Sequence, residues 1–192
     1  MDDRLTIREF QGEDWPTIKL VLLESDIYNA YGPTILKSEK NRIEFYSQVP
    51  EKGRVFIAVI PDPDTTEQEN KSEVDKEIPT QELIVGYAVI DFFGHGIFIL
   101  SLIIGKQYRD KGYGKQLMEY IKKFALGDLQ YTILRGFADE HLVNVHAFLL
   151  KQGFRACGFV EHDLEWNHST IHYVYRLHEE KEDESDAPLL SA

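Results

Sequence analysis

A strand, a glycine-containing loop, a helix and a second strand follow one another in the middle of this chain, and this order leaves few folds open. Residues 97–104 form a near-continuous apolar run, which predicts a strand covered on both faces. After the loop, Leu117, Ile121 and Phe124 recur at i, i+4 and i+7, the spacing of one helical face. Because this helix leads to the strand predicted over residues 131–138, the two strands must run parallel in one sheet.

Further strands and helices on both sides of this unit complete the predicted fold. Strands are predicted where apolar and polar residues alternate or β-branched residues gather, and helices where apolar residues recur at helical spacing. The strands cover residues 5–10, 54–60, 83–90, 97–104, 131–138, 155–161 and 170–177, and the helices start near Asp14, Ser38, Gly112 and Asn144. The order β-α-α-β-β-β-α-β-α-β-β predicts an α/β fold, of the α+β kind with one mixed sheet, in a single domain.

The sequence also predicts how several elements end. Asp14 can cap the first helix, and Tyr31-Gly32-Pro33 is expected to break it. Gly94-His95-Gly96 is expected to form a tight turn, and Asn167-His168 to lie where the last two strands join. Cys157 is the single cysteine; we expect a small buried apolar residue there, and an intramolecular disulfide cannot form.

The acidity of the chain is concentrated in two segments. The net charge is −12, of which −6 lies in residues 61–82 and −5 in residues 179–192, so the rest carries only −1. We expect a long acidic surface loop at 61–82, within a domain that spans residues 1–178, and a disordered acidic tail at 179–192. The lack of a basic surplus argues against nucleic acid as a partner.

Targeting and membrane segments are not predicted either. The N-terminus is charged, and the longest apolar runs are too short to cross a bilayer. A cytoplasmic location without membrane attachment is therefore expected.

The loop Arg109-Asp110-Lys111-Gly112-Tyr113-Gly114 has the features of a phosphate-binding site. It lies between a strand and a helix, where the first helical turn presents unpaired backbone N–H groups and a partial positive charge. Gly112 and Gly114 carry no side chain that would block close approach, and Arg109 and Lys111 add positive charge.

Two other phosphate-binding motifs do not fit this loop. A dinucleotide fingerprint would need a third glycine at position 117, which is Leu117. A P-loop would need glycine at position 109 and serine or threonine at position 116, where the chain has Arg109 and Gln116.

Two motifs make the chain resemble the GNAT superfamily of N-acetyltransferases. Arg109-x-x-Gly112-x-Gly114 matches the family pattern Q/R-x-x-G-x-G/A, which follows a strand and opens a helix. Lys151-Gln152-Gly153-Phe154, after a short predicted helix, resembles the end of the family's second motif. Together with Ala138-Asp139-Glu140, it is similar to the histone-acetylating branch. The element order is similar over nearly all of residues 1–178.

The resemblance implies a site for acetyl-CoA and no metal. The backbone at Leu102, Ile103 and Ile104 would bind the pantetheine arm, in a gap where the central parallel strands splay apart. Main-chain N–H groups would bind the pyrophosphate along Arg109, Asp110, Lys111, Gly112, Tyr113, Gly114 and Lys115. The implied activity is direct acetyl transfer to a primary amine in a ternary complex.

The resemblance does not identify the residues that transfer protons. In the histone-acetylating branch a glutamate is the base, and in much of the family a tyrosine donates to the leaving thiolate; Phe98 and Leu149 hold these positions here. Neither side chain can exchange a proton. Glu140 and His141 are the candidate catalytic residues, because they follow a strand that ends next to the expected reaction centre and imidazole titrates near neutrality. Other candidates are Asp91, Asp139, His146, Tyr173 and Tyr175.

Three functions therefore remain open. The first is an acetyl-CoA-dependent N-acetyltransferase whose partner is an amine-bearing small molecule, or a lysine or N-terminus of a protein. The second is a non-catalytic acyl-CoA-binding regulatory module of the same fold, which Phe98 and Leu149 favour. The third is an interaction domain without a cofactor. Monomer and homodimer are equally compatible with the sequence.

Overall fold

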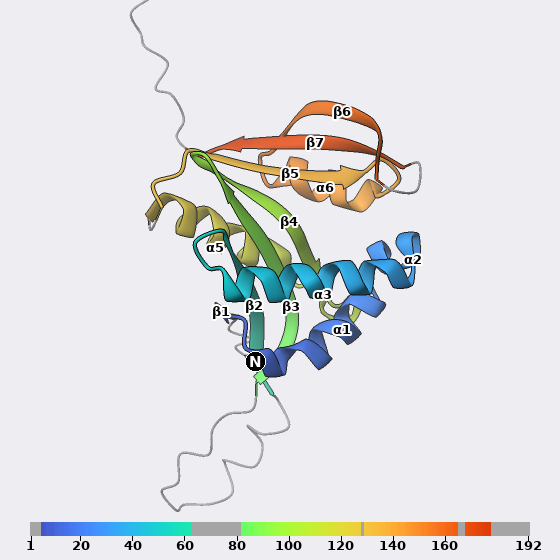
Figure 1. Ribbon diagram of the computed structural model, residues 1–192, viewed down its shortest axis with the longest axis vertical. Coiled ribbons are helices and arrows are strands. Elements are labelled where there is room, and N and C mark those ends of the chain that lie inside the picture. Colours follow the sequence, from blue (N-terminus) through green and yellow to red (C-terminus); the bar gives the residue numbers. More distant parts are fainter. Residues whose placement is uncertain (1–4, 63–81, 128, 165–167, 178–192) are drawn as a thin grey trace, which may run out of the picture.

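A seven-stranded sheet, in the order β1-β2-β3-β4-β5-β7-β6, forms the centre of the protein (Figure 1). The computed structural model describes residues 5–62, 82–127, 129–164 and 168–177. The strands are β1 (Thr6–Glu9), β2 (Gly53–Pro61), β3 (Glu82–Phe93), β4 (Gly96–Ile104), β5 (Ile133–Asp139), β6 (Arg155–Leu164) and β7 (His168–Arg176). Neighbouring strands are antiparallel except β4 and β5, which run parallel as predicted.

Helices cover the two faces of the sheet. The helices are α1 (Trp15–Leu23), α2 (Asp26–Tyr31), α3 (Pro33–Gln48), α5 (Tyr113–Gly127) and α6 (Val143–Lys151), with 3-10 turns at Gly12–Asp14 and Lys106–Tyr108. The residues buried under α1 and α3 form one core cluster, and those under α5 and α6 form another (Figure 1). The predicted α/β fold with one mixed sheet is confirmed. No helix among the described residues is long and apolar enough to cross a membrane.

The apolar run of β4 is covered on both faces, as predicted. Ile97 and Ile99 contribute to the core under α5 and α6, whereas Ile103 contributes to the core under α1 and α3. On the far side of the crossover, the apolar face of α5 includes Leu117 and Ile121, which are both fully buried. Within the strand-loop-helix unit, β4 thus lies in the middle layer of the molecule, and α5 covers one of its faces.

Three helices, rather than the predicted two, precede β2. Ser25 causes the additional break: its Oγ accepts a hydrogen bond from the Tyr28 N–H at 3.1 Å and starts α2. Gly32, at φ +64°, ends α2 at the predicted break. Pro33 then starts α3 well before the predicted start at Ser38, because its fixed φ suits a first helical position.

Two predictions about single residues are wrong. The Asp14 side chain makes no capping bond to α1, because its carboxylate accepts two hydrogen bonds from the Arg8 guanidinium, both 2.8 Å long. Cys157 is exposed rather than buried. It lies in β6, which is one of the two edge strands of the sheet and is exposed along residues 155–161.

The structure tests the two predicted turns but not the two acidic segments. The tight turn after Phe93 is confirmed, with Gly94 at φ +50° and Phe93 paired with Gly96. The start of β7 at His168 agrees with the predicted junction, of which residue 167 is not described. The acidic loop lies mostly at residues 63–81 and the acidic tail within 178–192, both outside the described part of the chain.

Candidate active site

A gap opens in the middle of the sheet where β4 and β5 separate. The two strands pair only from Gly96↔Ile133 to Ile99↔Gly136. Beyond that point, β4 continues to Ile104 and β5 to Asp139 without pairing to each other, and they diverge (Figure 1). The splayed parallel strands expected from the sequence are therefore present. Ligands of open α/β sheets bind at the carboxyl ends of the strands, and this gap lies at that edge.

Backbone groups of β4 face the gap at alternate residues. The Gly105 N–H donates to the Val85 carbonyl at 2.9 Å, which marks a hydrogen-bonded pair in the antiparallel ladder between β3 and β4. Alternation along the ladder then turns the N–H and C=O groups of Leu102 and Ile104 away from β3 and toward β5. Those of Ile103, the third residue predicted for this contact, face β3 instead.

A β-bulge lies at the point where the gap begins. The register between β3 and β4 passes from Val89↔Ser101 to Ile90↔Ile99, so Leu100 is an extra residue in β4. Bulges change the direction of backbone groups and are frequent beside functional sites. Leu100 follows directly after the last residue of β4 that pairs with β5.

The predicted phosphate loop has a backbone that favours anion binding. Asp110 and Gly112 have left-handed φ values of +62° and +83°. The Gln116 N–H donates to the Gly112 carbonyl at 3.1 Å, and this is the first helical hydrogen bond of α5. The preceding N–H groups of Gly114 and Lys115 therefore have no hydrogen-bond acceptor within the helix. Successive N–H groups in such a turn, at a helix N-terminus, form a concave anion site.

The Arg109 side chain holds the loop in place instead of extending toward a phosphate. Its Nη1 donates to Asp26 Oδ2 at 2.9 Å, and its Nε donates to the Ile104 carbonyl at 3.3 Å. The guanidinium therefore ties the loop to α2 and to the end of β4. The expected positive charge near the loop comes from Lys111 and Lys115, which are both exposed.

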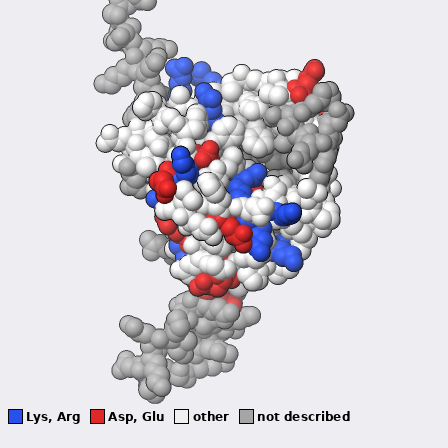
Figure 2. Space-filling view, viewed as in Figure 1, with Lys and Arg blue, Asp and Glu red and all other residues white. Residues whose placement is uncertain are grey.

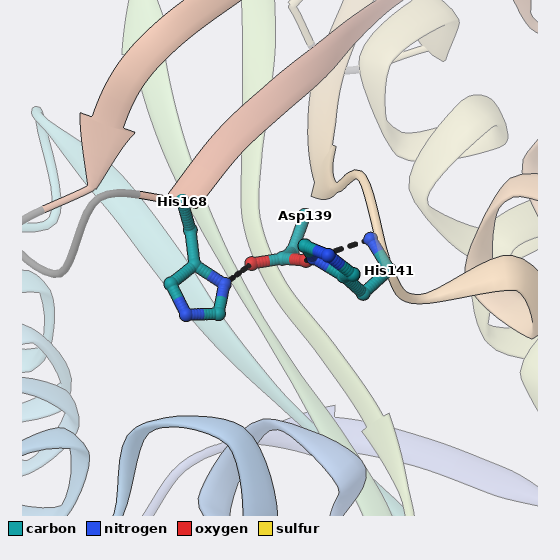
Figure 3. A group of neighbouring side chains, drawn as sticks. All are labelled: Asp139, His141 and His168. Atoms are coloured by element: carbon teal, nitrogen blue, oxygen red, sulfur yellow. Dashed lines mark hydrogen bonds and ion pairs between the residues drawn. The ribbon is translucent and has the colours of Figure 1, made fainter.

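A buried carboxylate with three side-chain partners lies across the gap, at the end of β5. Asp139 is only 3% exposed, and two imidazoles flank its carboxylate (Figure 3). His168 Nδ1 lies 2.5 Å from Oδ2, and His141 Nδ1 lies 3.1 Å from Oδ1, which also accepts from the His141 N–H at 2.8 Å. The Tyr31 hydroxyl of α2 donates to Oδ2 as well.

These donors keep Asp139 ionised. Burial alone would raise the pKa of Asp139, but hydrogen bonds from Tyr31, His141 and His168 outweigh burial, so the pKa lies below its ordinary value. A carboxylate only accepts hydrogen bonds, so each imidazole donates through Nδ1–H. Nε2 is then the ring atom that can take up a proton, and in His168 it points away from the carboxylate (Figure 3).

The same three side chains are close enough together to suggest a cation site. One ligand atom each from Asp139, His141 and His168 lies within 4.8 Å of the others. However, both Nδ1 atoms already donate to the carboxylate, so a metal ion would have to replace these two hydrogen bonds. The arrangement is that of a carboxylate that orients two imidazoles.

The two faces of the sheet carry different groups at the gap. Along β5, Gly136 and Ala138 face the core under α5 and α6. Phe137 and Asp139 face the opposite side, where Asp139 meets Tyr31 of α2 and Phe137 contacts Phe98 at a ring-centroid distance of 5.7 Å. The gap between β4 and β5 thus connects an apolar face with a face that carries the Asp139 cluster.

The α2 helix contacts both sides of the gap on the face of the Asp139 cluster. Asp26, in its first turn, pairs with Arg109 of the loop, and Tyr31, in its last, reaches Asp139. The Tyr31 ring also lies against His168, with ring centroids 5.1 Å apart. A short helix that follows the Ser25 cap therefore links the predicted phosphate loop to the end of β5.

The residues at the two usual catalytic positions are packed among apolar groups. Phe98 lies against Phe93 and Phe137, and Leu149 of α6 is 6% exposed within the core. One turn before Leu149, His146 Nδ1 lies 2.8 Å from the hydroxyl of Tyr173 on β7. Both residues were candidates from the sequence, and the structure brings them together.

The predicted pair Glu140 and His141 lies at the end of β5, as expected. His141 is part of the Asp139 cluster, although its side chain is 71% exposed. Glu140 is partly exposed, and its N–H donates to the Ser169 carbonyl at 3.0 Å. The candidates Asp91 and Tyr175 lie apart from the cluster, Asp91 with Tyr46 and Tyr175 against Phe154.

Sequence reasoning missed His168 and Tyr31. They lie 29 and 108 residues from Asp139 along the chain, and no local motif links them to it. The pairing of Asp139 with Thr170 in β7 could have indicated His168, but it depends on a register that the sequence does not specify.

Charge and shape can also be described on other parts of the surface. On the face drawn in Figure 2, the Lys and Arg side chains lie in small groups, with Asp and Glu side chains beside some of them. A hollow of about 430 Å³ lies beside α1 and the turn 105–108, with Asp14, Glu24 and Glu82 in its lining, and does not include the Asp139 cluster.

Comparison with known proteins agrees with this geometry. Residues 42–154, more than half of the chain, match the model of the acetyltransferase (GNAT) family. The matched range includes β4, the glycine loop, α5, β5 and α6. No curated protein matches the chain by sequence.

Solved structures share the fold at low identity. A GNAT-family protein from Desulfovibrio desulfuricans aligns over 91% of this chain and 100% of its own, with 11% identity and a TM-score of 0.69. The ribosomal-protein-S18-alanine N-acetyltransferase of Escherichia coli aligns over 94% and 98%, with 12% identity and a TM-score of 0.64. A spermidine/spermine N-acetyltransferase of Vibrio cholerae aligns over 92% and 94%, with 12% identity and a TM-score of 0.63.

Proposed function

The chain belongs to the acetyltransferase (GNAT) family, and from this premise we propose that it moves an acetyl group from acetyl-CoA directly to a primary amine in a ternary complex. The observation that carries the proposal is the gap between β4 and β5, with an anion-binding loop at one end and a carboxylate–imidazole cluster across it. Cosubstrate, acceptor and base would meet at this one place.

The donor site extends from the loop into the gap. The backbone N–H groups of residues 109–115 would bind the pyrophosphate, and Leu102 and Ile104 would offer N–H and C=O groups to the pantetheine amides. Gly114 lies between Ile104 and Phe148: a Cβ at this position would be 3.6 Å and 3.5 Å from their side chains. The arm would pass beside Gly114 toward the point where β4 and β5 separate.

The acceptor would approach from the opposite face, beside α2. A primary amine is protonated at neutral pH and must lose a proton before it can attack the thioester. A base is therefore needed on the side from which the amine arrives. The Asp139 cluster lies on that face and at the carboxyl end of β5.

We infer that a histidine held by Asp139 acts as this base. Both His168 and His141 donate Nδ1–H to the carboxylate, which fixes the tautomer that accepts a proton at Nε2. His168 has the shorter bond and is 28% exposed, against 71% for His141. We therefore assign the role of base to His168 of β7 first. His141 and Glu140, which directly follow β5, are the alternatives.

Initial rates test the reaction. We expect thiol release from acetyl-CoA in the presence of at least one member of a panel of polyamines, amino sugars, amino acids, peptide N-termini and lysine peptides. When both substrates are varied, direct transfer predicts intersecting double-reciprocal lines. Parallel lines would instead indicate an acetyl-enzyme intermediate and contradict the ternary complex.

Matched variants test the base. His168→Gln should lower kcat with the preferred amine by about a hundredfold, within the usual range for loss of a general base. His141→Gln and Glu140→Gln serve as comparisons with small expected effects. If His141→Gln or Glu140→Gln loses activity while His168→Gln keeps it, the assignment to His168 is wrong.

A second function is favoured by Phe98 and Leu149. Because neither usual proton-transfer group is present, the same fold could bind an acyl-CoA without turnover and act as a regulatory module. Acetyl-CoA would then raise the melting temperature, and no amine in the panel would release thiol above background hydrolysis.

A further inference from the structure

His146 of α6 carries a ring nitrogen that the fold leaves without a partner. Its Nε2 is buried, and no hydrogen-bond partner for it lies among the described residues. Buried polar atoms in proteins are nearly always hydrogen-bonded, so an exception needs an explanation. The other ring nitrogen, Nδ1, is engaged with the Tyr173 hydroxyl at 2.8 Å.

Tyr173 determines what the other ring nitrogen can do. Burial raises the pKa of Tyr173, so its hydroxyl keeps the hydrogen with which it can donate to His146 Nδ1. When the hydroxyl donates in this way, the hydrogen of the ring lies on Nε2. The buried atom is then an N–H donor without an acceptor among the described residues.

The register of the sheet places this donor at the point where the gap begins. Ile99 of β4 pairs with Gly136 of β5, and Gly136 pairs with Tyr173 of β7, so the three residues lie in one row across the sheet. Ile99 and Gly136 are the last pair before β4 and β5 separate. Tyr173 and Ile99 both belong to the core under α5 and α6, so His146 lies over this row on the same face as α5.

The middle of this row lacks a side chain. A Cβ added at Gly136 would have a single heavy-atom neighbour within 4 Å, the Ile99 carbonyl oxygen at 3.9 Å, although Gly136 itself is buried. On the proposed path, the pantetheine arm would enter from the loop along Ile104 and end near Gly136, where the thioester could be reached from both faces of the sheet.

We propose that His146 Nε2–H donates a hydrogen bond to the sulfur of the bound thioester and stabilises the thiolate that leaves. The inference rests on the proposed function and deepens it. Leu149, one turn further along α6, is the position of the usual tyrosine donor and is buried among apolar groups. His146 is on the same side of the helix and would supply the missing donor from one turn earlier.

The reaction then balances without a proton from His146. The amine nitrogen, deprotonated by the base, forms a bond to the carbonyl carbon, and the C–S bond breaks with its electron pair on sulfur. The second proton, on the nitrogen of the intermediate, passes to solvent, or to the base once the base has released its first proton to solvent. The hydrogen bond from Nε2 lowers the energy of the developing thiolate.

Two substitutions test the roles of the two ring nitrogens of His146 separately. His146→Asn keeps an acceptor for the Tyr173 hydroxyl and removes the donor at the Nε2 position, whereas His146→Gln can place an amide N–H near Nε2. We expect His146→Asn to lower kcat by about tenfold or more, the worth of one charge-assisted hydrogen bond, with a small change in KM for acetyl-CoA. His146→Gln should recover part of kcat.

The thiol pKa of bound CoA gives a readout that a packing role would not change. Thiolate absorbance in the ultraviolet, followed against pH for the complex of CoA with the full chain, should show a lower thiol pKa for wild type than for His146→Asn. Equal thiol pKa values, or a wild-type kcat in His146→Asn with unchanged melting temperature, would overturn the assignment. Failure of wild type to bind CoA would overturn the proposed function as well, so the two failures are distinguishable.

Discussion

At the scale of single residues, Asp139 is a carboxylate held almost wholly out of water by donors from three elements. Tyr31 reaches it from α2, His168 from β7, and His141 from the turn after β5. Hydrogen bonds to a charged group contribute more than neutral ones, and loss of a partner leaves the buried group unsatisfied. The cluster therefore combines structural stabilisation with the orientation of two imidazoles.

The pKa of Asp139 makes part of the stability dependent on pH. Because the folded-state pKa lies below the ordinary value, the ionised carboxylate contributes fully above the ordinary pKa of an aspartate. This contribution is lost as pH falls through the lowered folded-state pKa. We expect Asp139→Asn to reduce the free energy of unfolding by about 2 kcal/mol at neutral pH, and the deficit to shrink toward acid pH.

Denaturant unfolding of wild type and Asp139→Asn across the acid range measures this deficit. Asp26→Asn is a matched control, because Asp26 is about half exposed and its pair with Arg109 lies at the surface. A deficit that stays constant to the lowest pH would show that the charge of Asp139 does not stabilise the fold.

The glycines of the loop have separate roles. Gly112 has φ +83°, so alanine there is strained although an added Cβ would meet nothing within 4 Å. We expect Gly112→Ala to cost about 1–2 kcal/mol of stability, the usual penalty for a left-handed residue. Gly114 lies in α5 with ordinary φ, so Gly114→Ala should preserve or raise the melting temperature. Equal losses in both variants would contradict this distinction.

At the scale of elements, α2 links the loop to the end of β5 and is only six residues long. A helix of this length has little stability of its own, so its cap and tertiary contacts keep it folded. Ser25 provides the cap, with Oγ accepting from the Tyr28 N–H and donating to the Leu22 carbonyl at 2.6 Å.

Loss of the Ser25 cap should destabilise α2 and, with it, the proposed binding site of the amine. We expect Ser25→Ala to cost about 1 kcal/mol, to speed amide hydrogen exchange in α2, and to raise KM for the amine more than KM for acetyl-CoA. Thr17→Ala in α1 is a comparison outside the cap. Equal changes in both KM values would show that α2 does not belong to the acceptor site.

The elements near the loop could be predicted from the sequence because each depends on local signals. The apolar run of β4, the glycines of the loop and the amphipathic spacing of α5 lie within thirty residues of each other, and the crossover rule fixes their parallel arrangement. The Asp139 cluster depends on contacts between α2, β5 and β7 that only the tertiary fold defines. This is why His141 was predicted and His168 was not.

Edge position explains the wrong prediction at Cys157. An apolar residue in a strand is buried only if other elements cover that strand, and β6 lies at the end of the strand order, with Phe159 54% exposed. The sequence of β6 gives no sign of its place at the edge, since strand order in the sheet depends on long-range pairing.

At the scale of the whole molecule, the C-terminal segment leaves the sheet far from the proposed site. Arg176 pairs with Ile133 at the start of β5, and the Leu177 N–H donates to the Thr132 carbonyl at 2.8 Å. Asp139 lies at the opposite end of β5. Arg176, after which the described part of the chain soon ends, therefore lies about six residues, or 20 Å, from Asp139 along the direction of β5.

Deletion of residues 179–192 should leave kcat, both KM values and the melting temperature unchanged. The segment carries a net charge of −5, and charged tails are usually solvated. A change in KM for a polycationic amine alone, at low salt, would show that the tail attracts the acceptor and would contradict the prediction.

The measurement that tests the acetyl-CoA site most directly is calorimetric titration of acetyl-CoA into wild type, Gly114→Val and Gly12→Val. A side chain at position 114 would lie against Ile104 and Phe148, on the proposed path of the arm, whereas one at position 12 would meet nothing within 4 Å. The account predicts that acetyl-CoA binds wild type and Gly12→Val alike, and Gly114→Val at least about tenfold more weakly, a difference of roughly 1.4 kcal/mol. Equal affinity in all three proteins, or no binding to wild type, would contradict it.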